Sequence, residues 1–310
     1  MPEPGSTLKF KNFNHSMRVP FVIYADFESF IKPMDTCQPD PEESYTNKYQ
    51  RHVPSSFCFY VKCFDDTVYN STPKMYTAKM DDIDVGKIFV DELIKEVKSI
   101  YNAFKFPKKM IYTEEEAEQF ESSTNCHICG KELGNDRVRD HCHITGKFRG
   151  AAHNGCNINY KLPKFIPVVF HNLSGYDAHL FIKKLGLEDG KISCIPNNEE
   201  KYISFTKNVT VDKFKNKEGK EINVTRELRF IDSFRFMASS LDTLTKNLKP
   251  EQCKTLNKHF KGERRNLLLK KGIYPYEYMD SIKRLDETEL PPKSAFYSKF
   301  ELLWCDRRRV

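Results

Sequence analysis

Four cysteine and histidine residues near the middle of the 310-residue chain have the spacing of metal ligands. Cys126 and Cys129 are separated by two residues, and His153 and Cys156 repeat that spacing. Each pair can bind one edge of a tetrahedral ion, and thiolates favour zinc over magnesium or calcium. The sequence therefore predicts a structural Zn2+ site.

Three carboxylates have the types and positions for a different metal. Asp26 and Glu28 lie two residues apart in the apolar segment 19–31, so on a strand both side chains project from the same face. Asp177 follows the apolar segment 166–170 and opens a predicted helix. If the two strands are neighbours, the three groups supply oxygen ligands for Mg2+ or Mn2+. Such ions activate water and stabilise the leaving oxygen of a phosphodiester.

The segments that must position these residues alternate between strand and helix patterns. Runs of β-branched and aromatic residues predict strands at 19–31, 55–64 and 166–170, and two more on either side of a turn at 216–219. Helical spacing or capping residues predict helices after Asp84, after Thr113, in the second half of 171–187 and after Ser240. This order predicts an α/β fold.

Three phrases in these segments resemble motifs of a known family. YADFES, HNLSGYDAHLF and SSLDTL are similar to the first two exonuclease motifs and the intervening DNA-contact motif of family B DNA polymerases. RVPFVIYADFESF, FHNLSGYD and KGIYPYEYMDS are closest to the protein-primed polymerases of Polinton (Maverick) transposons, and the resemblance extends to about Lys299. It implies a ribonuclease-H-like 3′–5′ exonuclease domain, with a mixed sheet and flanking helices.

The resemblance also implies roles for individual residues. Asp26, Glu28 and Asp177 are then the catalytic ligands of Mg2+ or Mn2+. A frayed, single-stranded 3′ end has bases that are exposed for stacking. The residues that would contact it are His171, Asn172, Tyr176, Ser240 and Leu241. Tyr276 and Asp280 have the spacing of the motif that supplies a fourth carboxylate. The same stretch also resembles a segment that precedes that motif, so both assignments of Asp280 stay open.

A polymerase palm with its paired aspartates has no counterpart in these residues. The resemblance therefore implies the front portion of a longer DNA-directed DNA polymerase, whose protein primer is a partner of the full-length parent alone. The alternative is a catalytically dead remnant that binds DNA. Residues 301–310 do not resemble the family.

The stretch RVRDHCHITGKFRGAAHNGCNINY resembles the recombination endonuclease VII group of His-Asn-His nucleases. The resemblance implies a small ββα-metal, treble-clef-like zinc module in which His141 is the general base and Asp140 and Asn157 bind one divalent ion. His143 would contact the leaving group. Two alternatives remain, a DNA-binding zinc module acting through Lys147 and Arg149, and a scaffold.

We therefore expect a discontinuous exonuclease-like domain at 1–115 and 162–300, interrupted by a zinc-binding insert at 116–161. Residues 301–310 form an unmatched tail.

Composition limits the partners. The chain has 50 Lys and Arg against 43 Asp and Glu, a net charge of +7, and a basic run between Lys246 and Lys271 suits a polyanion such as DNA. No segment approaches the ~18 apolar residues of a membrane helix, and the N-terminus lacks the apolar core of a signal peptide. We expect an intracellular protein of the nucleus or cytoplasm, with no membrane partner and no small-molecule substrate.

Overall fold

The computed structural model describes residue 3 and residues 5–7, 16–34, 50–199, 201–269, 272 and 274–296. The tail at 301–310 and the last two lysines of the basic run, Lys270 and Lys271, lie outside the described residues. Within these ranges no helix has both the length and the apolar character needed to cross a bilayer.

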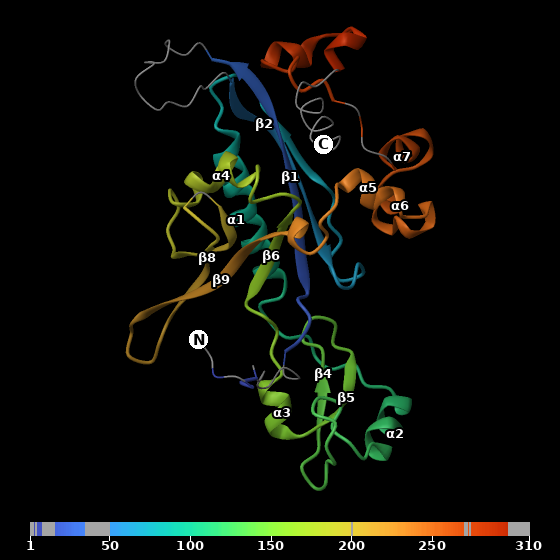
Figure 1. Ribbon diagram of the computed structural model, residues 1–310. Helices are drawn as coiled ribbons and strands as arrows, with labels where there is room; N and C mark the ends of the chain where they lie inside the picture. Colours follow the sequence, from blue (N-terminus) through green and yellow to red (C-terminus); the bar gives the residue numbers. More distant parts are fainter. Residues whose placement is uncertain are drawn as a thin grey trace.

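A seven-stranded mixed sheet organises the larger part of the fold (Figure 1). In sheet order its strands are β3 (Lys74–Thr77), β2 (Gln50–Cys63), β1 (Phe21–Pro33), β6 (Phe165–Phe170), β9 (Glu221–Asp232), β8 (Tyr202–Lys215) and β7 (Ile192–Pro196). β1, β6 and β9 run parallel to one another, whereas β3–β2–β1 and β9–β8–β7 pair antiparallel. The predicted α/β class is confirmed as a mixed α/β fold.

The side chains of strand β1 alternate between the two faces of this sheet. Ile23, Ala25 and Phe27 are buried, and the intervening Asp26 and Glu28 are exposed, as the period of two along a strand requires. The alternation stops after Glu28, where the register with β2 shifts and Ser29 pairs with Pro54. Proline cannot donate to a ladder, so it is found at such irregularities. A β-bulge therefore lies directly beside a carboxylate predicted to bind metal.

Two helices cover the buried face of the sheet, α1 (Val85–Ala103) and α4 (Ala178–Leu185) (Figure 1). Phe27 stacks on Phe181 of α4 with 5.6 Å between ring centroids and meets Phe89 of α1 edge to face at 4.8 Å. Such aromatic pairs stabilise a core beyond the area that they bury. The opposite face of β1 and β2 remains free of these helices.

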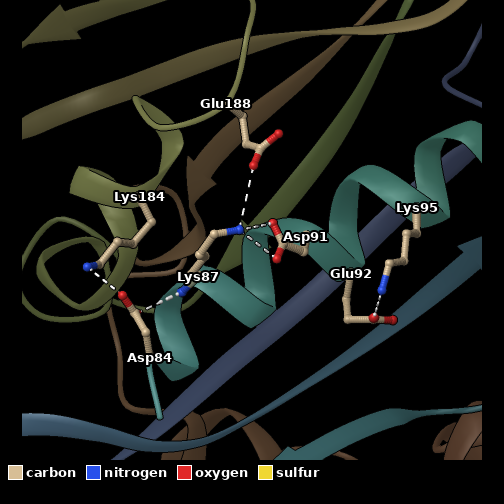
Figure 2. Close-up of polar contacts among 7 residues, drawn as sticks. All are labelled: Asp84, Lys87, Asp91, Glu92, Lys95, Lys184 and Glu188. Atoms are coloured by element: carbon tan, nitrogen blue, oxygen red, sulfur yellow. Dashed lines mark hydrogen bonds and ion pairs between the residues drawn. The ribbon is translucent and has the colours of Figure 1, made fainter. Parts of the chain in front are cut away.

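Polar contacts fix α1 against α4 (Figure 2). The Asp84 carboxylate accepts the backbone N–H of Lys87 at 3.0 Å, which caps α1 as predicted, and pairs with Lys184 at 2.6 Å. The Lys87 side chain reaches Glu188, just after α4, at 3.7 Å. These contacts hold the end of α4 that lies farthest from Asp177.

The insert has its own small core, built from Phe120, Cys126, Ile128, Leu133, Ala151 and Ala152. Its elements are α2 (Glu114–Ser122), the hairpin β4 (Val138–His141) and β5 (Phe148–Ala152), and α3 (Asn154–Asn159). Thr113 caps α2 through a capping box with Glu116. The β4–β5 turn belongs to the larger domain as well, because Ile144 is buried in the core beneath the sheet.

Short helices follow β9 along the other side of the sheet (Figure 1). They are η2 (Ser233–Arg235), α5 (Leu241–Lys246), η3 (Pro250–Gln252), α6 (Lys254–His259), α7 (Gly262–Leu268), η4 (Ile282–Asp286) and η5 (Lys293–Phe296). His259 of α6 meets Tyr60 of β2 edge to face, and Lys258 pairs with Asp66 at 3.4 Å. Tyr60 lies on the face opposite α1, so the described part of the basic run lies beside the open face of β2.

Candidate functional site

Asp177 is the buried member of the predicted carboxylate group. It occupies the N-cap position of α4, seven residues after β6 ends, and β6 is the parallel neighbour of β1. Its side chain is 3% exposed and makes no capping hydrogen bond, and its Oδ1 has no hydrogen-bond partner. Burial, with the negative charges of Asp26 and Glu28, raises the pKa of Asp177 to about 8. The three predicted carboxylates therefore interact across the boundary between β1 and β6.

This arrangement has the chemistry of a divalent-cation site. A buried carboxylate oxygen without a donor is costly, and a metal ion would satisfy it while offsetting the mutual repulsion of the three groups. The carboxylates are more loosely grouped than the cysteine and histidine cluster. That cluster is the only set in the described residues with at least three ligand atoms all within 4.8 Å.

Asp232 shapes the turn that leads to Asp177. Its buried carboxylate accepts the backbone N–H groups of Asn172 at 2.9 Å, Ser174 at 3.0 Å and Phe234 at 3.0 Å, together with the Ser174 hydroxyl at 2.9 Å. Burial alone would raise its pKa, but these hydrogen bonds outweigh it and hold the pKa below its ordinary value. They support Asn172 in a left-handed conformation with φ of 74°. Sequence reasoning missed Asp232, whose one signal is a carboxylate at the end of an apolar strand.

The predicted DNA-contact residues fall into two neighbouring segments. His171 joins them, because its Nδ1 lies 3.0 Å from the Ser233 hydroxyl and its Nε2 lies 2.8 Å from the Ser239 carbonyl oxygen. Ser240 caps α5 by accepting the N–H of Thr243 at 3.1 Å, and Leu241 is 49% exposed. The structure therefore brings 171–177 and 233–241 together, with His171 and Ser240 engaged inside the chain.

Tyr176 points toward β1 and β2. Its hydroxyl group contacts Ser29 and lies 2.8 Å from His52 Nδ1. Burial raises the pKa of Tyr176, the Ser29 hydroxyl lowers it, and the charges of Asp177 and Glu28 raise it further. Tyr176 is thus held beside the carboxylates.

The segment at 274–280 reaches the same region. The Ile31 N–H of β1 donates to the Met279 carbonyl oxygen at 2.9 Å. Burial and the charge of Glu28 raise the pKa of Tyr274 to about 12, so this phenol lies near the carboxylate group. Asp280 pairs with Arg284 at 3.3 Å and accepts a hydrogen bond from Ser281 at 3.0 Å.

The predicted zinc ligands come together in the insert. Cys126, Cys129, His153 and Cys156 offer ligand atoms that all lie within 4.8 Å of one another. His153 Nε2 lies 2.9 Å from the Glu132 carbonyl oxygen, to which it can only donate, so Nδ1 is left to face the sulfurs. The Nδ1 atom of His153 lies 3.5 Å from the Cys129 sulfur and 3.9 Å from the Cys156 sulfur. An outer hydrogen bond of this kind orients metal-bound histidines.

Two of the cysteine ligands have pKa values shifted in opposite directions. Burial raises the pKa of Cys126, but the backbone N–H groups of Cys129, His153 and Ile128 outweigh it and bring the pKa to about 6. Burial and the neighbouring sulfurs raise the pKa of Cys156 to about 11. A divalent cation resolves this repulsion, since thiolate is the form that binds zinc. The cluster fits zinc.

Asp140, which was predicted to bind a catalytic ion, already has two side-chain partners. It is 2% exposed, and its two oxygens contact Arg149 at 2.6 Å and His127 Nε2 at 2.9 Å. Burial by itself would raise its pKa, but these two partners hold it below its ordinary range. His141 and His143 lie next to this pair, with 5.1 Å between ring centroids. Asn157, in α3, is partly exposed.

Residues 100–166 match the family model of recombination endonuclease VII. The endonuclease VII-like segment includes all four predicted zinc ligands, the β4–β5 hairpin and α3. The match supports a nuclease-type insert. The strands that carry Asp26, Glu28 and Asp232 lie outside the endonuclease VII-like segment. No curated protein and no solved structure matches the chain.

Proposed function

We propose that this chain is a DNA-binding nuclease whose sheet domain, residues 1–115 and 162–300, hydrolyses 3′-terminal phosphodiesters. Asp26, Glu28 and Asp177 would hold two Mg2+ or Mn2+ ions, which activate water and stabilise the leaving oxygen. The observation that carries this proposal is the buried Asp177 Oδ1 without a hydrogen-bond donor, beside two further carboxylates.

The sheet order favours the ribonuclease-H-like form of the fold. An antiparallel β3–β2–β1 meander followed by parallel β6 and β9 is the arrangement of that fold, with β8 and β7 as an extension. In this form the carboxylates of the central strand and of the segment after the next parallel strand converge. The zinc insert, residues 116–161, then interrupts the connection between α1 and β6.

The chain's own residues would position the DNA. Tyr176 and the exposed Leu241 lie on the two segments that His171 joins, where the bases of a frayed 3′ end can stack. Lysines and arginines of the basic run beside β2 would neutralise phosphates. Together they favour single-stranded 3′ ends over intact duplex.

The test is hydrolysis of 5′-labelled single-stranded DNA in Mg2+ or Mn2+. We expect stepwise loss of the 3′ end, abolished in Asp26→Ala/Glu28→Ala and in Asp177→Asn. Glu221→Gln is the control, because Glu221 is an exposed carboxylate at the β8–β9 turn that pairs with Lys213 at 2.8 Å. Hydrolysis that survives the double change would show that another site cuts the DNA.

We further propose that the chain is the exonuclease region of a family B polymerase of the Polinton type. The phrases that resemble this family occur in β1, at 171–177 and at 239–244. A remnant that binds DNA without hydrolysis is the competing form. It predicts unchanged DNA affinity in Asp26→Ala/Glu28→Ala and no product with any divalent ion.

A second function, endonuclease activity of the insert, is favoured by the match to recombination endonuclease VII. His141 would act as the base and Asn157 as an ion ligand. Asp140 could bind an ion only after Arg149 or His127 releases it. Nicking of branched DNA should then be lost in His141→Ala with zinc content unchanged, and the exposed His179→Ala should nick normally. Equal nicking by both variants would assign the insert to DNA binding or scaffolding.

A further inference from the structure

The connection between α1 and α2 is fixed against the turn of the β4–β5 hairpin. The Lys108 N–H donates to the His143 carbonyl oxygen at 2.8 Å, and the Ile111 N–H donates to the Gly146 carbonyl oxygen at 2.7 Å. Gly146 approaches so closely that a β-carbon there would lie 2.6 Å from the Lys109 carbonyl oxygen. Two segments distant in sequence therefore form one surface at the junction of the sheet domain and the insert (Figure 1).

This surface is basic. Lys108 and Lys109 are exposed, and within the described ranges neither pairs with a carboxylate. Lys147, on the neighbouring turn, is 70% exposed and reaches Asp65 only at 3.9 Å. Three cationic side chains thus lie on adjacent stretches of backbone that hydrogen bonds hold in place.

An exposed aromatic ring lies in the same connection. Phe106 is 79% exposed, and the Lys105 ammonium, which pairs with Asp212, lies 5.7 Å from its ring centroid. A ring this exposed gains little from the fold, whereas a nucleic-acid base could stack on it beside cationic groups that bind phosphate. The surrounding lysines disfavour an apolar protein partner, because its approach would strip water from them.

We infer that Phe106, Lys108, Lys109 and Lys147 form a DNA-binding surface that recognises a backbone next to an unpaired base. The surface shares no residue with the carboxylate group or with the basic run beside β2. It borders that run, because Lys147 and Lys258 reach the adjacent residues Asp65 and Asp66. The backbone of Lys108 is hydrogen-bonded to that of His143. DNA bound to this surface would therefore place its fork or gap beside the hairpin of the insert.

The test measures binding by fluorescence anisotropy in magnesium-free buffer, with a plain duplex and a forked duplex of the same length as probes. Lys108→Ala/Lys109→Ala should weaken both complexes and lower the slope of log affinity against log salt by about 1–2. Phe106→Ala should weaken the forked complex roughly 5- to 150-fold, the range for one stacked base, with the salt slope unchanged. The control Lys215→Ala/Lys217→Ala removes the same charge from the exposed β8–β9 turn.

Three outcomes overturn the inference: equal effects of the two lysine pairs, an unchanged forked complex in Phe106→Ala, or loss of duplex and forked binding alike in Phe106→Ala. The same measurements in Asp26→Ala/Glu28→Ala separate this surface from the proposed exonuclease. If that background shows the predicted differences while the parent chain hydrolyses nothing, the surface stands and the exonuclease proposal fails.

Discussion

Gly86 of α1 lies directly against Leu180 of α4. A β-carbon at Gly86 would be 2.6 Å from the Leu180 carbonyl oxygen and 3.4 Å from the Phe181 Cα, so only glycine permits this separation of the helices. Asp177 immediately precedes α4. The contact between the two helices therefore helps to fix the position of the Asp177 carboxylate.

Gly86→Ala should destabilise the fold by about 1–3 kcal/mol, because backbone atoms must move to admit the methyl group. It should also slow DNA hydrolysis, since α4 carries Asp177 with it. Chemical denaturation and the 3′-end assay measure the two effects.

The control for this change is at the other end of α4. Gly186 has helical dihedral angles, and a β-carbon there meets only the Lys183 carbonyl oxygen at an ordinary 3.7 Å. Gly186→Ala should therefore be neutral or stabilising by up to about 1 kcal/mol. Effects of the same sign at both positions would argue against steric contact at Gly86.

Asp177 makes the stability of the metal-free protein depend on pH. Its pKa is about 8 in the fold against 3.8 without it, so between these values the folded chain holds a proton that the unfolded chain has lost. Its contribution is therefore fully favourable below about pH 4 and declines as pH rises to about 8. Asp177→Asn should flatten this decline and raise Tm near pH 8, by about 2–4 °C per kcal/mol. Thermal melts across pH 5–9 measure it.

Added Mg2+ or Mn2+ should reverse the order of the two proteins. A cation that binds the folded state stabilises it, so the parent chain should gain Tm with metal while Asp177→Asn gains little. Identical shifts in both would place the bound ions elsewhere.

Local pattern predicts much of this molecule. The strand at Asp26 and Glu28, the cap at Asp84, the helix after Thr113 and the spacing of Cys126 and Cys129 each follow from neighbouring residues. The structure confirms these elements and brings the zinc ligands together. The role of Asp232 could not be predicted, because its carboxylate accepts hydrogen bonds from backbone N–H groups 58 and 60 residues away. Its role depends on the pairing of β6 with β9, a tertiary relationship that no local period encodes.

Asp232→Asn should destabilise the fold by about 1–3 kcal/mol, because an amide offers one acceptor oxygen to donors that now share two. The turn at 171–177 should loosen, so hydrolysis should fall further than DNA binding does. Asp242→Asn, which disturbs an exposed pair in α5, should change stability by less than about 0.5 kcal/mol. Equal behaviour of the two variants would remove Asp232 from the support of the site.

Loss of zinc should weaken both parts of the chain. We expect about one zinc per chain by elemental analysis, lost in Cys126→Ser and retained in Cys194→Ser, whose thiol is exposed. Because Ile144 is buried in the larger core, Cys126→Ser should also lower the Tm of the sheet domain. A sheet domain that melts identically with and without zinc would contradict this coupling.

The Asp140–Arg149 pair gives a test that needs no DNA. Arg149→Leu leaves a buried carboxylate with His127 as its remaining partner and should destabilise the fold by about 3–5 kcal/mol. Arg149→Leu/Asp140→Leu removes that unpaired charge, so it should be less destabilised than the single variant. Additive losses would show that the two side chains act independently.

The burial of Ile144 also determines whether the insert can be removed or transferred independently of the sheet domain. A module attached by two flexible connections could be deleted or transferred, leaving its host intact. Here the tip of the β4–β5 hairpin fills space beneath the host's own sheet, so excision would open a cavity there. Removal of the insert would therefore also remove a side chain from the core of the sheet domain.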